Sequence, residues 1–342
     1  MNITASPFGK TKVGVPVTLY TLDSGDGMSA SIIDYGAALR SLVVPSKRGS
    51  VDVILGYDTI DEYEQNGGFM GAVVGRVANR IGKGRFALNG KCCRLGLNDG
   101  ANHLHGGETG FYARMWRAVP RDGALSLLYL SPDGEEGYPG NLACAVTYAL
   151  KGGALEISYS ALSDSDTLCC MSSHCYFNLA GRGDILSHRL TVDADGYCPI
   201  DIAGLADGRV LPVEDTAFDF RTETPVGAAL SANSEQIRYG AGIDHNFALG
   251  ASGFRRAAAL RSEESGIRME VLTDMPGLQV YTGNSLTERP GKSGARYAPR
   301  SGICLETQFF PDAINHPGMR PPILRASEFW KSRTVYKFDI AD

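Results

Sequence analysis

Apolar and polar positions alternate with a period of two along much of the chain. In ALEISYSALS (154–163), leucine, isoleucine, tyrosine and alanine alternate with glutamate and serine, and IRMEVLT (267–273) repeats the pattern. Successive side chains of a strand point to opposite faces of a sheet, so this period predicts two half-buried strands.

The chain before these segments has the pattern of an antiparallel meander. ALSLLYLS (124–131) and LACAVTYAL (142–150) are strand-like, the loop PDGEEGYPG (132–140) separates them, and KGG (151–153) makes a tight turn. Helical patterning is scarce: 58–65 predicts a short helix opened by an Asp cap, and 74–80 predicts one turn. We therefore expect an all-β fold, a large antiparallel sandwich with very few short helices.

The organisation of the chain indicates one domain. It has 342 residues, 43% of them hydrophobic, which is enough for a large core. Since there is no Pro- or Ser-rich linker, charge block or fixed-period repeat, we expect a single domain over residues 1–342.

Charge and targeting signals restrict the partners. The net charge of -5 arises from interspersed acids and bases without a long basic run, so we expect no nucleic-acid partner. The N-terminal stretch lacks the apolar core of a signal peptide, and no apolar run approaches the roughly 20 residues of a membrane span. We expect a soluble, cytoplasmic protein with no membrane partner.

The eight cysteines do not match a disulfide scaffold, because they are spread over a long chain. Two pairs are adjacent, Cys92 with Cys93 and Cys169 with Cys170, which is neither redox nor the usual zinc-ligand spacing. We expect reduced, mostly buried thiols.

The segment SSHCYFNLAG (172–181) combines an apolar face with a polar one. In a strand, His174, Tyr176 and Asn178 share one face, and the apolar residues between them share the other. The apolar face predicts contact with a core, and the polar face predicts the floor of a cleft.

A second segment, GICLETQFFPDAINHP, places a carboxylate in apolar surroundings. Glu306 and Gln308 lie with Cys304 on one face of the expected strand, and Leu305 lies on the other. A carboxylate in that setting needs a partner or a function, so an ion pair with an arginine and a catalytic role both stay open.

The segment NHLHGGETG raises the question of a metal site. His103 and His105, two apart on a strand, would face the same way and share a metal ion. The alternative is a loop, indicated by Asn102 and the Gly106–Gly107 pair, in which one histidine contacts substrate and the other packs locally.

Further polar positions indicate a sheet lined for a polyhydroxylated ligand. They are Gln279 and Tyr281 in GLQVYTGN, Asp244, His245 and Asn246 in GIDHNF, and Arg76, Asn79 and Arg80 in GRVANRIGKGRF. PGKSG (290–294) lacks the first glycine of a phosphate-binding loop, and neither a serine-hydrolase elbow nor a dinucleotide fingerprint occurs.

Taken together, the motifs resemble those of the aldose 1-epimerase (galactose mutarotase) family. The resemblance runs in order from residue 53 to residue 317 through VILGYDTIDEY, GAVVGRVANRIGKGRF, NHLHGG, GYPG, HCYFNLAG, IDHNF, PGLQVYTGN and LETQFFPDAINHP. It implies a β-supersandwich with an open sugar-binding cleft, and neither a metal nor an organic cofactor.

The resemblance also implies roles for individual residues. Glu306 would be the general base, His174 the general acid, and His105 a second histidine near the ring oxygen. The sugar hydroxyls would be bound by Asn79, Arg80, Asp244 and Gln279, whereas Arg76 is expected to be structural. The chain departs from the family pattern at Ser173, where asparagine is usual, and at Cys175, where a hydroxyl residue is common. The strand phase is unchanged, so the acid is expected to be retained, and the departure bears on the groups that orient the imidazole and on sugar preference.

The implied reaction interconverts the α and β anomers of free hexoses such as glucose and galactose. One group removes the proton of the C1 hydroxyl while another protonates the ring oxygen, which is general acid–base catalysis. A histidine acid must be held protonated at neutral pH, and Glu306 and Asp244 are the expected sources of negative charge.

Three alternatives accompany this reading. A hexose-6-phosphate 1-epimerase, or a mutarotase for another sugar, would keep the fold and change the substrate. A non-catalytic sugar-binding sandwich would not need both Glu306 and His174, and a metal-dependent enzyme would depend on His103 and His105. The sequence is compatible with a monomer or a homodimer.

Overall fold

The computed structural model describes residues 2–65, 67–121, 123–250 and 252–340, and strands dominate them. Every pairing between named strands of this part of the chain is antiparallel, as the meander pattern predicts. The fold is therefore the expected all-β class.

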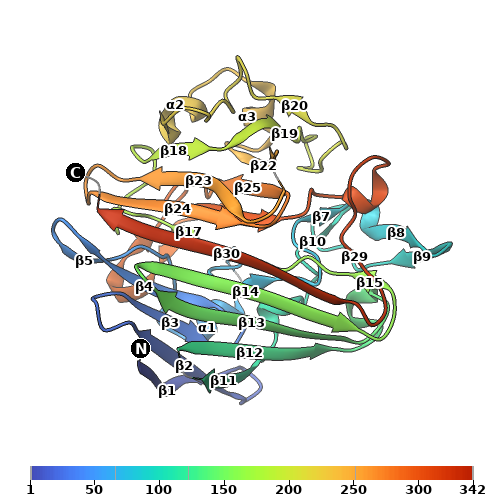
Figure 1. Cartoon of the computed structure of the whole chain (residues 1–342), viewed down its shortest axis with the longest axis horizontal. Coiled ribbons are helices and arrows are strands. Elements are labelled where there is room, and N and C mark those ends of the chain that lie inside the picture. The colour runs from blue at the N-terminus through green and yellow to red at the C-terminus, as the bar shows by residue number, and fades with distance from the viewer. Residues whose placement is uncertain (1, 66, 122, 251, 341–342) are drawn as a thin grey trace.

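The widest sheet has nine strands and crosses the front of Figure 1. In spatial order its strands are β11 (Arg117–Arg121), β12 (Ala124–Ser131), β13 (Leu142–Lys151), β14 (Ala154–Ser163), β30 (Phe329–Ile340), β24 (Ile267–Thr273), β23 (Arg255–Arg261), β18 (Arg189–Val192) and β21 (Thr224–Pro225). The predicted strands 124–131, 154–163 and 267–273 coincide with β12, β14 and β24. In β14 the alternation is realised as predicted, since Leu155, Ile157 and Tyr159 are buried and the residues between them are half-buried.

A six-stranded sheet carries the polar motifs. Its order is β17 (Tyr176–Phe177), β28 (Ile303–Gln308), β25 (Gly277–Tyr281), β22 (Asp244–Leu249), β19 (Ala194–Tyr197) and β20 (Leu211–Pro212). β25 and β28 are buried on both faces. One face contributes Leu278, Val280 and Leu305 to the main core cluster, which also contains Ile157 and Tyr336 of the nine-stranded sheet.

The chain begins with a five-stranded meander. It consists of β1 (Asn2–Lys10), β2 (Pro16–Asp23), β3 (Ser29–Ile33), β4 (Leu39–Ser46) and β5 (Gly49–Asp52). Leu22, Ile32 and Leu42 of this sheet belong to the same main core cluster.

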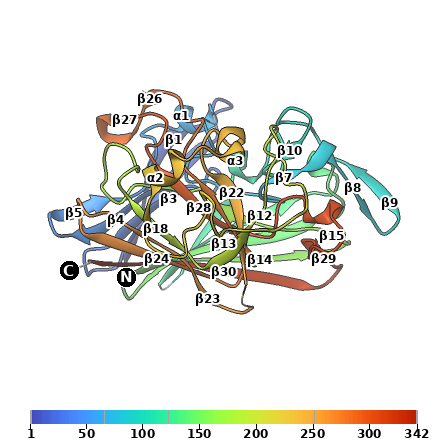
Figure 2. The same ribbon diagram turned by 90° about the horizontal axis from the view of Figure 1, so that it is seen from above.

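Short strand pairs and helices complete the architecture. The pairs are β6 (Val73–Val74) with β16 (Ser172–Ser173), β7 (Arg80–Ile81) with β10 (His103–Leu104), β8 (Arg85–Leu88) with β9 (Lys91–Arg94), β15 (Thr167–Leu168) with β29 (Ile323–Leu324), and β26 (Arg289–Pro290) with β27 (Arg296–Tyr297). The α-helices of the described residues are α1 (Ile60–Glu64), α2 (Val226–Leu230) and α3 (Glu235–Tyr239). Figure 2 shows β14, β30, β24 and β23 along one side, β22 and β28 above them, and β7, β10, β26 and β27 beyond.

The short helix predicted within residues 58–65 is present as α1, but its predicted cap was wrong, as was the helical turn predicted at 74–80. The helix α1 is capped by Thr59, whose side chain forms a capping box with Glu62, and not by Asp58, which pairs with Arg40. Residues 74–80 form no helical turn, because Val73–Val74 pairs with β16 and Val77 bridges to Cys170.

The cysteines behave as expected. All eight are free thiols, and only Cys92 is exposed. Among the described helices, none has the length and apolar character required to cross a bilayer.

Candidate active site

The seven residues to which the family resemblance assigns catalytic or sugar-binding roles line one cleft on the six-stranded sheet. The cleft is a hollow of about 490 Å³, a volume that includes space open to solvent. It is lined by Gly68, Phe69, Asn79, Arg80, Leu104, His105, His174, Tyr176, Asp244, Gln279, Tyr281, Ser285 and Glu306. The lining is thus drawn from segments far apart in the sequence.

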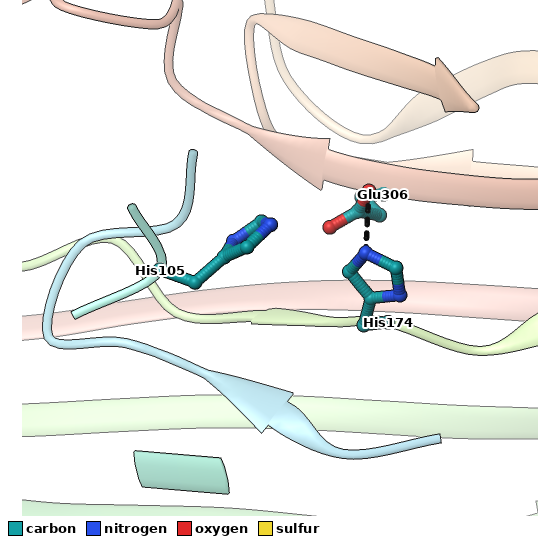
Figure 3. Close-up of side chains that lie close together, drawn as sticks. All are labelled: His105, His174 and Glu306. Carbon is teal, nitrogen blue, oxygen red and sulfur yellow. Dashed lines mark ion pairs between the residues drawn. The ribbon is translucent and has the colours of Figure 1, made fainter. Parts of the chain in front are cut away.

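Glu306 lies at the floor of the cleft, on β28. It is 2% exposed and is paired in register with Gln279 of β25. Its Oε1 lies 3.8 Å from Nε2 of His174, while Oε2 has no hydrogen-bond partner among the described residues (Figure 3). The predicted alternative of an arginine ion pair is wrong, since the titratable group within 4 Å of this carboxyl group among the described residues is the imidazole of His174.

The surroundings of Glu306 favour its protonated form. Burial raises the pKa of Glu306 well above its ordinary value, and the nearby charge of Asp244 acts in the same direction. Arg80 opposes these effects. A carboxyl group in this state holds a proton more tightly than an exposed glutamate does.

His174 follows β16, and its ring is enclosed by other aromatic rings. Phe69, His105 and Tyr176 lie with their ring centroids 5.5, 5.2 and 5.0 Å from that of His174. Burial lowers its pKa to about 4, although a hydrogen bond with its own backbone acts in the opposite direction. Burial therefore opposes the expected protonation of His174, whereas an ionised Glu306, 3.8 Å away, would favour it.

His105 lies at the end of β10, opposite Glu306 and His174 in Figure 3. The backbone N–H of Asn79 donates to its Nδ1 at 3.1 Å, and the His105 N–H donates in return to the Asn79 carbonyl. Since Nδ1 accepts a hydrogen bond, a neutral ring carries its proton on Nε2. Burial lowers the pKa of His105 well below its ordinary value, which keeps the ring neutral.

The loop after His105 is held by a carboxylate. Glu136 accepts hydrogen bonds from the backbone N–H groups of Glu108 and Thr109 and from the Thr109 hydroxyl. This anchor, together with the reciprocal bonds to Asn79, fixes the position of the imidazole.

Of the two alternatives for His103 and His105, the structure fits the loop and not the shared metal site. His103 is fully buried, and its Nδ1 donates to the Gly96 carbonyl at 2.7 Å while Nε2 accepts from the Tyr138 hydroxyl at 2.8 Å. The two histidines do not face the same way, because β10 ends at Leu104 and His105 adopts a left-handed φ of 51°. His103 is therefore the locally packed histidine, and His105 is the one in the cleft.

The donor set of the cleft also fits a metal ion poorly. Ring nitrogens of His105 and His174 and a carboxylate oxygen of Glu306 lie within 4.8 Å of one another, which is close enough for shared coordination. However, His105 already carries a proton on the nitrogen that faces the cleft, and a metal ligand needs that lone pair.

A chain of charged and polar groups forms one wall. Arg80 donates from Nε to Asp99 at 2.8 Å, and its NH1 lies 3.9 Å from Asp244. Gln279 donates to the other oxygen of Asp244 at 2.7 Å, and Asn79 accepts from the Arg80 backbone N–H. The carbonyl oxygen of Gln279 has no protein partner among the described residues, so it is available to a ligand.

Some residues flagged by the sequence lie outside the cleft. Arg76 is buried and bonded to the 131–140 loop, which confirms its structural assignment. Asn178 does not line the floor as predicted, because its amide donates to the carbonyls of Arg182, Gly183 and Ser301. His245 is enclosed by Gln236 and the Asp244 backbone.

The positions that depart from the family pattern are not next to the His174 ring nitrogens. Ser173 and Cys175 are buried and contact each other, with 3.0 Å between Oγ and Sγ. The second partner of the His174 ring is Cys304, whose Sγ lies 3.5 Å from Nδ1.

Sequence reasoning missed Phe69, Leu104 and Ser285 of the lining. Phe69 stacks edge-on against His105 and Tyr112 from a glycine-rich loop that carries no periodic pattern. Only the turn signal of the glycines marks this segment, and it does not identify the side chain that enters the cleft.

Known proteins resemble the chain over almost its whole length. The family model described as Aldose 1-epimerase matches residues 18–337. Galactose mutarotase of Mus musculus is 42% identical over 347 aligned residues, which cover 100% of each chain. Aldose 1-epimerase of Escherichia coli K12 is 37% identical over 333 aligned residues, which cover 95% of this chain and 96% of the relative. The crystal structure of galactose 1-epimerase from Lactobacillus acidophilus superimposes with a TM-score of 0.87 at 31% identity, covering 100% of this chain and 99% of that one.

Proposed function

Because the chain belongs to the aldose 1-epimerase family, we propose that its cleft acts on free hexoses such as glucose and galactose through Glu306 and His174. The enzyme is an isomerase, a mutarotase that interconverts the α and β anomers of a sugar. The observation that carries the proposed residue roles is the approach of Glu306 to His174 within 3.8 Å in a buried cleft.

The reaction requires one proton to be shared between an acid and a base. In the form active for ring opening, Glu306 is a carboxylate and His174 an imidazolium. Glu306 removes the proton of the C1 hydroxyl, the C1 carbonyl forms, and the bond between C1 and the ring oxygen breaks. The ring oxygen takes its proton from Nε2 of His174.

Ring closure reverses these transfers. Rotation about the C1–C2 bond presents the other face of the carbonyl, after which Glu306 returns its proton to the C1 oxygen and His174 recovers its own from the ring oxygen. In the free enzyme, burial favours the neutral pair with the proton on Glu306. The same single proton serves both forms, so no external acid is needed.

The other residues of the cleft bind and orient the sugar in this proposal. His105 offers a fixed N–H donor toward the ring oxygen, since Asn79 occupies its other nitrogen. Arg80, Asp244 and Gln279 offer donors and acceptors to the sugar hydroxyls.

The wall of the cleft favours an uncharged sugar over a phosphorylated one. Arg80 is the basic residue in the lining, within the described residues, and Asp99 and Asp244 already neutralise it. A phosphate group needs unpaired cations or several free N–H donors.

We also propose that residues 1–342 form one domain that works in the cytoplasm, as a monomer or a homodimer, without nucleic-acid or membrane partners. Eight free thiols fit a reducing compartment, and the main core cluster draws residues from Leu22 to Tyr336.

The test is polarimetry on freshly dissolved α-D-galactose, α-D-glucose and α-D-glucose 6-phosphate, with protein dialysed against a chelator. We expect the wild type to speed anomeric equilibration of the free hexoses without added metal, and His174→Asn to lose most of this effect. Full activity of His174→Asn contradicts the acid assignment. A preference for the phosphorylated sugar contradicts the substrate class.

A further inference from the structure

The two histidines of the cleft differ in what their Nδ1 atoms contact. Nδ1 of His105 faces a backbone N–H and must accept, so its proton lies on Nε2. Nδ1 of His174 faces Sγ of Cys304 at 3.5 Å, a separation suited to a hydrogen bond with sulfur. Sulfur is a weak partner that can donate or accept, so the direction of this bond decides which nitrogen of His174 is protonated.

Cys304 is placed to act on His174 and on little else. It lies on β28, two residues before Glu306, and is fully buried. It is paired in register with Tyr176 and Tyr281, on the side of the sheet that faces the cleft. Burial and the nearby Glu306 raise the pKa of the Cys304 thiol well above its ordinary value, so the group is a neutral thiol.

The geometry around Nε2 indicates the direction of the bond. Nε2 faces Oε1 of Glu306, and burial favours the proton on that carboxyl group. At 3.8 Å the two groups do not form a hydrogen bond in this structure, but Nε2 is the nitrogen that has to exchange a proton with the carboxyl group and the sugar in the proposed reaction. A ring that has given up its Nε2 proton retains the proton on Nδ1. In that arrangement Sγ accepts the Nδ1–H bond whether the ring is neutral or charged.

The other titratable groups facing the ring do not compete for this proton near neutral pH. Tyr176 and Tyr281 are held neutral because burial raises the pKa of each phenol. His105 is held neutral by burial, and its Nε2 is already protonated. Proton exchange is thereby confined to Glu306 and His174.

We propose that Cys304 is a positioning residue: its sulfur accepts the Nδ1–H of His174 and so keeps Nε2 free to exchange a proton with Glu306 and the sugar. This inference rests on the proposed function for its kinetic consequence, but the position of the ring proton is independent of any substrate. The two cleft histidines then hold opposite tautomers, His105 as a fixed donor and His174 as a proton carrier.

The test compares Cys304→Ala, which removes the acceptor, with Cys304→Ser, which retains one. Nitrogen-15 NMR of the imidazoles reports the tautomer of each of the six histidines, with His174→Asn identifying the signals of His174. We expect wild type and Cys304→Ser to carry the His174 proton on Nδ1 at neutral pH, and Cys304→Ala to move it to Nε2. Cys175→Ala is the matched control, because it removes a buried thiol beside His174 that does not touch the ring nitrogens.

Kinetics give the second readout. Hydrogen-bond partners on the far nitrogen of metal-bound histidines are worth about 10- to 100-fold, and we expect a loss of this order in the kcat of Cys304→Ala with KM nearly unchanged. Cys304→Ser and Cys175→Ala should stay near the wild-type kcat.

Each result decides the question. A wild-type His174 protonated on Nε2, an unchanged tautomer in Cys304→Ala, or a Cys304→Ser as slow as Cys304→Ala in a folded protein overturns the proposal. If Cys304→Ala does not fold, the wild-type and Cys304→Ser spectra still decide it. If the wild type lacks mutarotase activity but the tautomer changes as expected, the proposed sugar chemistry fails and the role of Cys304 stands.

Discussion

Arg76 and Glu306 are both 2% exposed, yet they differ in how many hydrogen bonds their charged groups make. All three guanidinium nitrogens of Arg76 donate to oxygens of residues 131–140 and Thr167. Glu306 has one contact with His174, and its second oxygen has no partner among the described residues.

The difference separates a structural charge from a functional one. A buried charge with all its hydrogen bonds made stabilises the loops around it, whereas one left incomplete destabilises the fold and is available to a ligand. Burial alone does not distinguish the two groups.

The sharpest test of the comparison is Glu306→Gln. Loss of the base should lower kcat by about 10²- to 10⁴-fold, measured by polarimetry. The melting temperature should hold or rise at neutral pH, because burial raises the folded-state pKa of Glu306 and its ionisation therefore opposes folding as the pH increases. Glu156→Gln on the half-exposed face of β14 is the matched control and should change neither quantity. A strongly destabilised Glu306→Gln would place Glu306 with the structural charges.

Arg76→Met should show the reverse pattern. Removing the guanidinium leaves several buried carbonyls unpaired, and loss of one partner of a buried polar cluster costs about 3–5 kcal/mol of unfolding free energy. Denaturant unfolding measures this loss, and the folded fraction should keep its kcat. Arg117→Met, at an exposed position of β11, should stay within about 0.5 kcal/mol of the wild type. Stability of Arg76→Met equal to that control would contradict the comparison.

His103 and His105 extend the comparison to two residues of one motif. His105→Gln should lower kcat by about 10²-fold, the typical effect of removing one preorganised donor, with little change in melting temperature. His103→Gln should cost about 1–3 kcal/mol of stability, since Gly96 and Tyr138 lose their partner, and should leave kcat nearly intact. Exchanged outcomes would reverse the assignment of the two rings.

The pH profile of kcat/KM gives the smallest effect. In the proposed mechanism Glu306 and His174 share one proton, so activity should fall when the pair gains a second proton and again when it loses the last one. Burial sets the first limit, through the His174 pKa of about 4, and moves the second above the ordinary range of glutamate. Rates corrected for spontaneous mutarotation should therefore decline on both sides, and Arg76→Lys should shift neither limb. A single alkaline rise without a plateau would contradict the shared proton.

The sequence predicted correctly those strands in which the alternation of apolar and polar residues reflects one buried face and one partly exposed face. The strands at 124–131, 154–163 and 267–273 are half-buried, so their alternation marks both the strand and its inner face. The residues expected in the cleft were identified from motifs that resemble those of the family, and all seven of them line the cleft in the structure.

The failures have a common physical origin. The same-face alternative for His103 and His105 required an unbroken strand, whereas β10 ends at Leu104 and His105 has a left-handed backbone. Asn178 lies just beyond β17, and its amide donates to the carbonyl of Arg182 in the following turn and to that of Ser301, which is distant in sequence. The contact of Cys304 with His174 joins residues 130 apart in sequence, and no local periodicity encodes such a contact.

The strand β28 divides its residues between two tasks by parity. Ile303 and Leu305 belong to the main core cluster and Thr307 bonds to Thr334 of β30, whereas Cys304 and Glu306 face the cleft. Selection or design can therefore vary one set while the other stays fixed. The face of β28 that carries the proposed base and the face that packs in the core therefore consist of alternate residues of one six-residue strand, so a change in the cleft does not require a new core.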